Sequence, residues 1–445
     1  MAHSTRRRAA VAVLTTTAVL ALPALPASAV SAPGAFRAPT AGVAEGGGGG
    51  ESAGMAHGSG KGHGSGNWRG GWAASAQAPS PSPGRNWSDK GFERQTVRQV
   101  VRLSTGGSRV RIELSNRYGG TPLTITGATV ARTAQGASVR PGSVRDLSFA
   151  RTRSVTVPAG GEVRTDALPL KVRALESLTI TLYLAGPTGP ATHHSLASAT
   201  SYRAAGDHRS DEGATAFKET SASWYYLSGV EVSGGGPVRR DGVVAFGDSI
   251  TDGHGSTRDR NNRWPDELAE RFAATGHPRS VVNHGISGNR LVNDSPTSGE
   301  KAVARFRKDV LNEPNVRWVI LLEGINDIGR SGVGGAPDVT VSQLINAQRS
   351  LIRQAHAKGI EVIGATLTPF KGAGYYSERG EAKRDALNDW IRTSDEFDGV
   401  LDLDRALADP ADGDRMAPAY DTGDHLHPND AGYRAMAEAV DLDEL

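Results

Sequence analysis

The sequence contains no cysteine, and this one absence excludes disulfide bonds, thiolate metal sites and a cysteine nucleophile together. An excess of charge of either sign is also missing, because 50 Lys and Arg face 48 Asp and Glu, giving a formal net charge of +2. Without a basic excess we expect no nucleic-acid partner. A protein without disulfides needs a large hydrophobic core, and 445 residues are enough for more than one domain.

Long apolar runs are missing beyond the amino terminus, so we expect no stable membrane insertion once a signal segment is removed. The amino terminus itself has Arg6–Arg8, then an apolar stretch, then Ala27–Ala29. This order predicts a signal peptide over residues 1–29 and a secreted protein. Residues 30–66 are rich in Gly, Ser, Ala and Pro, which predicts a disordered linker because such residues cannot bury a core.

Residues 67–236 show a period of two. Val110, Ile112 and Leu114, for example, alternate with charged side chains, and glycine-rich turns separate the alternating segments. Alternation of this kind is typical of half-buried strands. We therefore predict an all-β domain over residues 67–236, a jelly-roll-like sandwich without helices.

Residues 237–445 follow a different rhythm, in which apolar runs alternate with stretches of helical period. The apolar runs predict buried parallel strands at 243–246, 280–282, 316–322, 360–365 and 399–403. The helical stretches cover 264–274, 299–311, 341–357, 381–392 and 429–440. Strands and helices that alternate in this way predict a three-layer α/β/α sandwich with a parallel sheet, which we assign as the catalytic domain.

Chemically useful side chains follow several of these strands. Because ligands gather at the carboxyl ends of parallel strands, we expect them on one rim. Ser249 is the predicted nucleophile, His427 its base, and Asp424 the carboxylate that orients His427. The backbone N–H groups of Ser249 and Gly288 and the side-chain amide of Asn326 are the predicted oxyanion donors.

Two alternatives concern the histidines. His425 competes with His427 as base, but the spacing of three residues from Asp424 favours His427. Asp424, His425 and His427 could instead ligate a metal ion, a reading that leaves Ser249 and Asn326 without a role. We therefore expect neither a metal ion nor a cofactor.

The remaining polar residues on the predicted rim have less specific roles. Asp248, Asn289, Arg290 and Asp327 are candidate substrate-rim residues. The aspartates could equally hold loops by accepting backbone N–H bonds. A carboxylate pair for glycoside cleavage, made from Asp248 and Asp327 with Asp252 or Glu323, is a third reading.

Tryptophans of the predicted β domain offer a carbohydrate-binding surface, since aromatic faces stack on sugars. The alternative, which we favour, is that they pack in a core, because tryptophan is usually well buried. The residues concerned are Trp68, Trp72, Trp87 and Trp224.

Four segments together resemble, in order and context, the signature blocks of the SGNH (GDSL) hydrolase family. They are Gly247-Asp248-Ser249, Gly288, Gly324-Ile325-Asn326-Asp327 and Asp424-His425-Leu426-His427. The resemblance covers about residues 238–445 and implies a flavodoxin-like fold. It also implies that the matching Ser, Gly, Asn and His are nucleophile, two oxyanion donors and base. Flanking phrases resemble a branch of arylesterases and acylhydrolases associated with xylanase gene clusters, which implies a short acyl ester, such as one on plant polysaccharide.

These observations predict a secreted serine carboxylic ester hydrolase. We expect a monomer that acts through an acyl-enzyme on a small-molecule or polysaccharide-linked acyl ester. A lipase or lysophospholipase of the same fold is an alternative with the same chemistry. A non-catalytic glycan-binding protein is an alternative of another class, whose mark would be a lost Ser, Asn or His; Ser249, Asn326 and His427 are all present.

Overall fold

The structure is a computed structural model that describes residues 67–81, 86–234, 239–333 and 337–445. The signal peptide and linker predicted over residues 1–29 and 30–66 lie outside the described residues. The described residues belong to one compact unit, Gly62–Leu445. We call residues 68–233 the β region and residues 242–445 the α/β region.

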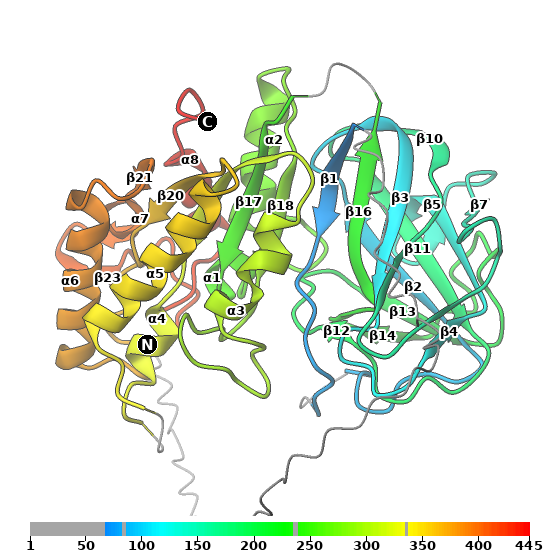
Figure 1. Ribbon diagram of the computed structural model, residues 1–445, viewed down its shortest axis with the longest axis horizontal. Coiled ribbons are helices and arrows are strands. Elements are labelled where there is room, and N and C mark those ends of the chain that lie inside the picture. The colour runs from blue at the N-terminus through cyan, green and yellow to red at the C-terminus, as the bar shows by residue number, and fades with distance from the viewer. Residues whose placement is uncertain (1–66, 82–85, 235–238, 334–336) are drawn as a thin grey trace, which may run out of the picture. The chain divides into compact units, whose positions relative to one another are not determined.

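The β region contains two main antiparallel sheets (Figure 1). The five-stranded sheet consists of β1 (Trp68–Ala73), β16 (Leu227–Ser233), β3 (Gly107–Ser115), β10 (Leu168–Val172) and β9 (Glu162–Arg164). The seven-stranded sheet consists of β14 (Glu219–Ser221), β13 (Ser201–Ala205), β2 (Gln95–Arg102), β11 (Ser177–Leu184), β5 (Gly127–Gln135), β6 (Ser138–Val139) and β7 (Arg145–Asp146). Two short pairs, β4 (Leu123–Ile125) with β8 (Val155–Val157) and β12 (His193–His194) with β15 (Trp224–Tyr225), complete the region.

The period of two places one face of each main sheet in a shared core. Ile112 and Leu114 of β3 are fully buried, and they belong to the same hydrophobic cluster as Ile180 and Leu182 of β11. No helix interrupts the described part of this region. The antiparallel strands agree with an all-β region, while the jelly-roll connectivity of residues 67–236 stays a prediction.

The tryptophans of the β region pack inside it. Trp68, Trp72, Trp87 and Trp224 are at most 8% exposed. The rings of Trp72 and Trp224 meet edge to face at 4.7 Å, and Trp87 stacks on Tyr225 at 5.3 Å. The carbohydrate-binding hypothesis is therefore wrong for these four tryptophans, because no ring face is open to a sugar.

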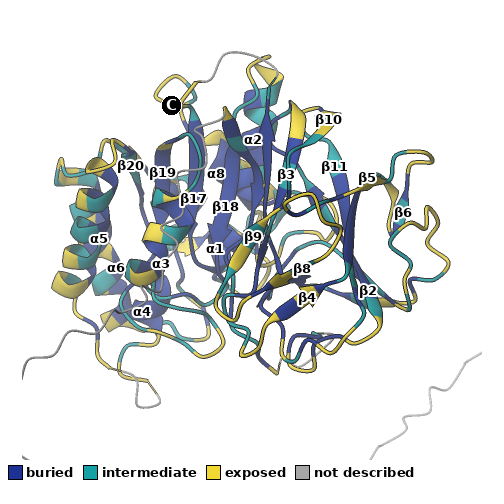
Figure 2. Cartoon of the chain, turned by 45° about the vertical axis from the view of Figure 1, so that its right-hand side comes forward, coloured by how far each residue is buried: buried dark blue, intermediate teal, exposed yellow. Residues whose placement is uncertain are grey.

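The α/β region is built on a parallel sheet, as predicted. Its strands lie in the order β18 (Val281–Gly285), β17 (Gly242–Gly247), β19 (Val316–Leu322), β20 (Glu361–Ala365) and β21 (Gly399–Leu401). Counted along the chain this is the order 2-1-3-4-5 of flavodoxin-like folds, whose ligands bind where the order reverses. Every residue of β17 and β18 is buried, which explains the unbroken apolar run of β17, while β18 also contains the buried polar residues Asn283 and His284 (Figure 2).

Helices cover both faces of the parallel sheet. Parallel crossovers are right-handed, so the helix that leads from β17 to β18 lies on one face of the sheet. The helices that lead from β18 to β19, from β19 to β20 and from β20 to β21 lie on the opposite face. Contacts agree with this division, since α2 (Trp264–Ala274) packs on α8 (Asp430–Glu438), and α5 (Val341–His356) packs on α3 (Ala302–Phe306) and α6 (Glu378–Thr393). Shorter elements are α1 (Ser249–Asp252), η1 (Arg307–Leu311), α4 (Ile325–Gly329), α7 (Leu403–Leu407) and the pair β22 (Ala408–Asp409) with β23 (Asp412–Met416). Among the described residues, none of the helices has the length and apolar character that a membrane crossing requires.

Most helix limits follow from capping residues. Thr340 and Gln343 form a capping box at the beginning of α5, and Ser377 and Asn429 cap α6 and α8. The helix predicted over residues 299–311 begins only at Ala302, and its second half is the π-helical turn η1. The reason is local: the backbone N–H of Ala302 donates to the carbonyl oxygen of Arg290, which ties the helix start to the loop after β18.

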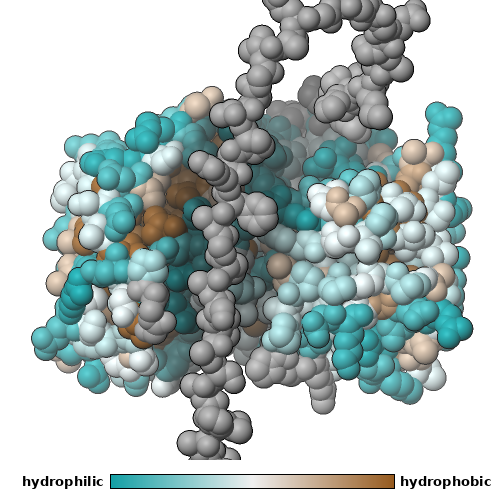
Figure 3. Space-filling model, turned by 60° about the horizontal axis from the view of Figure 1, so that its bottom comes forward, coloured by the Kyte–Doolittle hydropathy of each residue, from teal (hydrophilic) through white to brown (hydrophobic). Residues whose placement is uncertain are grey.

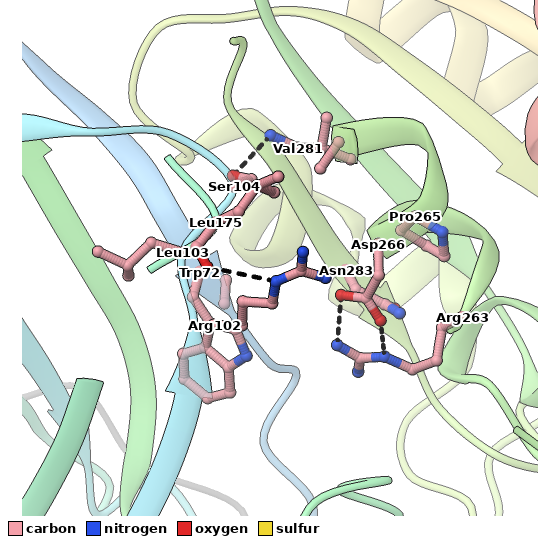
Figure 4. A pocket seen from close by; sticks show the side chains of 12 residues that line it. Trp72, Arg102, Leu103, Ser104, Leu175, Arg263, Pro265, Asp266, Val281 and Asn283 are labelled. Carbon is pink, nitrogen blue, oxygen red and sulfur yellow. Dashed lines mark hydrogen bonds and ion pairs between the residues drawn. The ribbon is translucent and has the colours of Figure 1, made fainter. Parts of the chain in front are cut away.

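The β region packs against the α/β region along β1 and β18 (Figure 4). Ser280 donates its hydroxyl proton to the carbonyl oxygen of Gly70 over 2.6 Å, and the backbone N–H of Val281 donates to Ser104 Oγ over 3.0 Å. The pocket left beside these bonds measures about 20 Å³, which is room for about one water molecule. The two regions therefore pack closely at this place, whereas a cavity of about 360 Å³ beside Gly70, Glu113 and His284 separates them elsewhere.

Candidate active site

Ser249 lies at the carboxyl end of β17, at the first position of α1. Asp248 caps this short helix, and its side chain accepts a hydrogen bond from the backbone N–H of Ile250 over 3.0 Å. The backbone N–H of the first residue of a helix has no partner within the helix. The turn after β17 therefore presents both the hydroxyl and the backbone N–H of Ser249 at the rim of the sheet.

His427 and Asp424 extend from Ser249 in one hydrogen-bonded series. His427 Nε2 lies 2.8 Å from Ser249 Oγ, and His427 Nδ1 lies 2.6 Å from Asp424 Oδ2. A carboxylate can only accept, so Nδ1 carries the proton and Nε2 is left to accept from the serine hydroxyl. The other oxygen of Asp424 accepts from the backbone N–H groups of Leu426 and His427, which fixes the carboxylate in place.

The surroundings favour a neutral His427 and an ionised Asp424. Burial lowers the pKa of His427, and the hydrogen bond to Asp424 opposes this shift without cancelling it. Burial alone would raise the pKa of Asp424, but its hydrogen bonds from His427 hold that pKa well below the usual range. A neutral imidazole held by an ionised carboxylate is suited to accept a proton near neutral pH.

His425 pairs with Asp421 and does not contact Ser249. Its Nδ1 lies 2.6 Å from Asp421 Oδ2, and its backbone has a positive φ of 61°. The structure thus brings His427 to Ser249, while His425 pairs with a different aspartate.

Asn326 is the second residue of α4, directly after β19. Its side chain is buried, and its Nδ2 has no hydrogen-bond partner among the described residues. The hydroxyl of Tyr375 lies 3.5 Å from Asn326 Oδ1, on the acceptor end of the amide. A buried amide N–H without a partner is costly, so its presence at this rim indicates a donor kept open for a ligand.

Gly288 follows β18 in a loop that requires glycine. Its φ is +76°, and a Cβ at this position would lie 2.5 Å from Ser298 Oγ. Both observations exclude a larger residue without rearrangement. Ser249, Gly288 and Asn326 thus follow β17, β18 and β19, three neighbouring strands whose carboxyl ends share one edge.

Asp248 and Asp327 do not lie on the rim. They are 0% and 1% exposed, and Asp327 accepts from the backbone N–H groups of Leu291 and Val292. Burial raises the pKa of Asp248, and it raises the pKa of Asp327 to about 6. The substrate-rim prediction is therefore wrong for both residues, and their loop-holding alternative agrees with the contacts.

Asn289 is also buried, so the same prediction is wrong for it. Its Nδ2 donates to the carbonyl oxygens of Ser298 and Glu300, each over 2.8 Å. Arg290 is half-buried and donates to the carbonyl oxygen of Asp294. Asn289 braces the loop rather than facing a substrate.

The carboxylate pair proposed for glycoside cleavage does not form. Asp252 and Glu323, the two further carboxylates of that reading, are 1% and 0% exposed. Since Asp248 and Asp327 are buried as well, none of the four can reach a sugar.

His254 lies beside the catalytic series, and sequence reasoning missed it because no motif marks it. Its ring centroid is 4.1 Å from that of His427, and the residue is exposed. One ligand atom each of His254, Asp424 and His427 lies within 4.8 Å of the others, an arrangement that could hold a metal ion. Glu381, Asp385 and Asp414 form a second such group in the part of the chain that the structure describes.

Figure 3 views the face to which the carboxyl ends of the parallel strands point. Apolar side chains gather on the side of this face that the α/β region forms, amid more hydrophilic surface.

A serine, an imidazole and a carboxylate in hydrogen-bonded series, at the carboxyl edge of a parallel sheet, are the arrangement found in serine hydrolases. The GDSL-like Lipase/Acylhydrolase family matches residues 245–435, which span all four segments of the resemblance described above. This part of the chain is similar to that family, and the match supports an ester-bond hydrolase.

Several solved structures are similar to part of the chain. An acetyl xylan esterase, AlAXEase, is 23% identical, covers 44% of this chain and 96% of its own, and has a TM-score of 0.36. An acetyl xylan esterase from Geobacillus stearothermophilus is 23% identical, with 45% and 94% covered and a TM-score of 0.36. A GDSL-like lipase from Bacteroides thetaiotaomicron is 22% identical, with 45% and 85% covered and a TM-score of 0.34. No curated protein matches the chain.

Proposed function

We propose that the protein is a secreted serine carboxylic ester hydrolase that acts through an acyl-enzyme on short acyl esters. The observation that carries the proposal is the series in which Ser249 Oγ lies 2.8 Å from His427 Nε2 and Asp424 holds His427 Nδ1 at 2.6 Å. Secretion is supported by the order of residues in the predicted signal peptide, Arg6–Arg8 before an apolar stretch and Ala27–Ala29. The short acyl group is supported by the resemblance of the flanking phrases.

In the first half of the reaction, Ser249 Oγ attacks the ester carbonyl carbon while its proton passes to His427 Nε2. Asp424 stabilises the imidazolium that forms. The oxyanion accepts hydrogen bonds from the backbone N–H groups of Ser249 and Gly288 and from Asn326 Nδ2, the amide nitrogen that is otherwise unpaired among the described residues. His427 then protonates the leaving alcohol, and the acyl group stays on Ser249.

In the second half, a water molecule takes the place of the alcohol. His427 Nε2 accepts a proton from the water, whose oxygen attacks the acyl carbon, and the same donors stabilise the second oxyanion. Return of the proton to Ser249 Oγ releases the carboxylic acid and restores the enzyme.

The test is an ester panel run on the wild type beside Ser249→Ala. The panel contains p-nitrophenyl esters of increasing acyl length, acetylated xylan and a phospholipid. We expect hydrolysis of the short esters, unaffected by EDTA, and its loss in Ser249→Ala by about 10⁴-fold or more. Full activity in Ser249→Ala would refute the mechanism, and a preference for long acyl chains would favour a lipase over the short-ester proposal.

A further inference from the structure

We propose that the β region is a working part of the catalytic centre, because Ser75 and His194 position the loop that carries Gly288. The inference rests on the proposed function of Gly288 as an oxyanion donor. It assigns two positioning residues that lie outside residues 245–435, the part matched by the hydrolase family.

The first connection runs through His194 and Asp252 to Ser287, the residue before Gly288. His194, from β12, lies with Nε2 2.9 Å from Asp252 Oδ1. The other oxygen of Asp252 accepts from both the backbone N–H and the hydroxyl of Ser287, each over 2.8 Å. Asp252 is itself the last residue of α1, which begins at Ser249.

The contacts of His194 define its charge. Its Nδ1 lies 2.9 Å from the carbonyl oxygen of Ser75, and its Nε2 lies near Asp252 and the carbonyl oxygen of Leu196. Carbonyl and carboxylate oxygens only accept, so both ring nitrogens carry protons and His194 is an imidazolium. Burial alone would lower the pKa of His194, but Asp252 raises it by more. His194 and Asp252 therefore form an ion pair with side chains that are 3% and 2% exposed.

The second connection runs through Ser75 and Arg305 to Asn289, the residue after Gly288. Ser75 Oγ lies 2.8 Å from Asp309 Oδ2 and accepts from Arg305 Nη1 over 3.3 Å. Arg305 Nε donates to Asn289 Oδ1 over 2.9 Å, and Arg305 Nη2 donates to the carbonyl oxygen of Gly247, next to the nucleophile turn. Ser75, Arg305 and Asn289 are all at most 3% exposed.

Gly288 is thus flanked by two residues that are each anchored to the β region through one intermediate side chain. A glycine loop has more conformational freedom than any other, and it needs such external support to hold an N–H group in place. Displacement of a catalytic donor by about 1 Å can cost about 100-fold in rate. Loss of the anchor should therefore slow turnover more than it weakens substrate binding.

The test compares two substitutions of His194 with the same two substitutions of its neighbour His193. His194→Gln places an amide N–H donor near the position of Nε2 and can still reach Asp252. His194→Asn is shorter and can reach only the carbonyl of Ser75. His193 lies in the same strand, is 2% exposed, and contacts Asn86 rather than Asp252, so His193→Asn and His193→Gln control for a lost buried imidazole.

Two quantities are measured on each variant: kcat and KM for a short p-nitrophenyl ester, and amide hydrogen exchange of residues 286–290. We expect His194→Asn to lower kcat about tenfold to 100-fold with KM nearly unchanged, and to speed exchange in this loop. His194→Gln should recover most of the loss, and the His193 variants should keep wild-type kcat. Should His194→Asn fail to fold, Ser287→Ala removes one of the bonds to Asp252 and should lower kcat in the same direction by about two- to tenfold.

Wild-type kcat and loop exchange in His194→Asn, or equal losses in His193→Asn, would overturn the inference. Wild type and Ser249→Ala are assayed in the same series. Inactive wild-type protein would refute the proposed function instead, and the exchange measurement, which needs no substrate, would still decide whether His194 holds the loop.

Discussion

Two buried polar side chains, Arg98 of the β region and Asn326 of the α/β region, differ in how their hydrogen-bond donors are used. In the β region, Arg98 is 1% exposed, and its guanidinium donates to the carbonyl oxygens of Ala137 and Asp211 and to Thr181 Oγ1. In the α/β region, Asn326 is also buried, at 3% exposed, but its Nδ2 has no partner among the described residues. Polar groups that are satisfied stabilise a fold, whereas one left open at the edge of a sheet is available for chemistry.

The strands show the same contrast. In β3 buried and half-buried residues alternate from Val110 to Leu114, so polar side chains are distributed along the strand. In β17 every residue is buried, and the polar residues Asp248, Ser249, Thr251 and Asp252 come together where the strand ends. Parallel strands with continuous apolar sequences thus concentrate chemically active side chains at one edge.

The largest expected effect concerns the two histidines of the same loop. His427→Gln removes the base that accepts the proton of Ser249, so we expect kcat for a short ester to fall about 10⁴-fold to 10⁶-fold. His425→Gln is the control, because His425 contacts Asp421 rather than Ser249. Comparable losses in both variants would mean that the loop, and not the base, had been damaged.

Two buried asparagines of the α/β region differ in whether their side-chain amide is paired. Asn326→Ala removes the unpaired amide donor, so we expect kcat to fall about 10²-fold to 10³-fold with little change in thermal stability. Asn388→Ala removes an amide whose oxygen and nitrogen are both bonded to the backbone of Leu367. We expect this control to lower Tm and leave kcat of the folded protein unchanged; the reverse pattern would refute the assignment.

Substitution of a tryptophan in the β region is expected to affect stability rather than catalysis. Trp87 is 8% exposed and packs on Tyr225 and Phe92, so Trp87→Ala should lower the free energy of unfolding by about 3–5 kcal/mol. Denaturant unfolding measures this loss, and Trp87→Phe should recover part of it. At temperatures where the variant is folded we expect unchanged kcat. Unchanged stability with lost affinity for a glycan would restore the sugar-binding reading.

The smallest expected effect is a shift in pH dependence. The reaction needs neutral His427, so kcat/KM falls as the pH drops through the pKa of His427, which burial and then the nearby His254 place below the usual 6.5. His254→Gln removes the charge of His254 and should move this acidic limb towards higher pH. A pH–rate profile of both proteins measures the shift, and a displacement towards lower pH would contradict it.

Local sequence patterns were sufficient for the parallel sheet and for the pair Asp424 and His427, whereas the pairing of His427 with Ser249, 178 residues away, was expected from the shared rim and the family resemblance. The apolar run of β19 at Val316–Leu322 begins and ends where the run predicts. Asp424 and His427 are three residues apart, so a short turn brings both to one place. Such features depend on neighbours in the chain, and a sequence displays them directly.

The direction of a polar side chain after a strand could not be predicted. Asn289 and Asp327 follow predicted strands as Ser249 does, yet both point into the fold, because loop carbonyls and N–H groups there need partners. His194 gave no signal at all, since its partner Asp252 is 58 residues away. Contacts of this kind depend on the packing of one region on another, which no local pattern contains.

Covalent labelling shows directly whether Ser249 is the nucleophile. The protein is treated with a fluorophosphonate, digested and analysed by mass spectrometry while residual ester hydrolysis is followed. We predict one adduct per chain, on the peptide that carries Ser249, with activity lost in proportion to labelling. Full ester hydrolysis by protein whose Ser249 is completely labelled, or complete inactivation with Ser249 unmodified, would contradict the account.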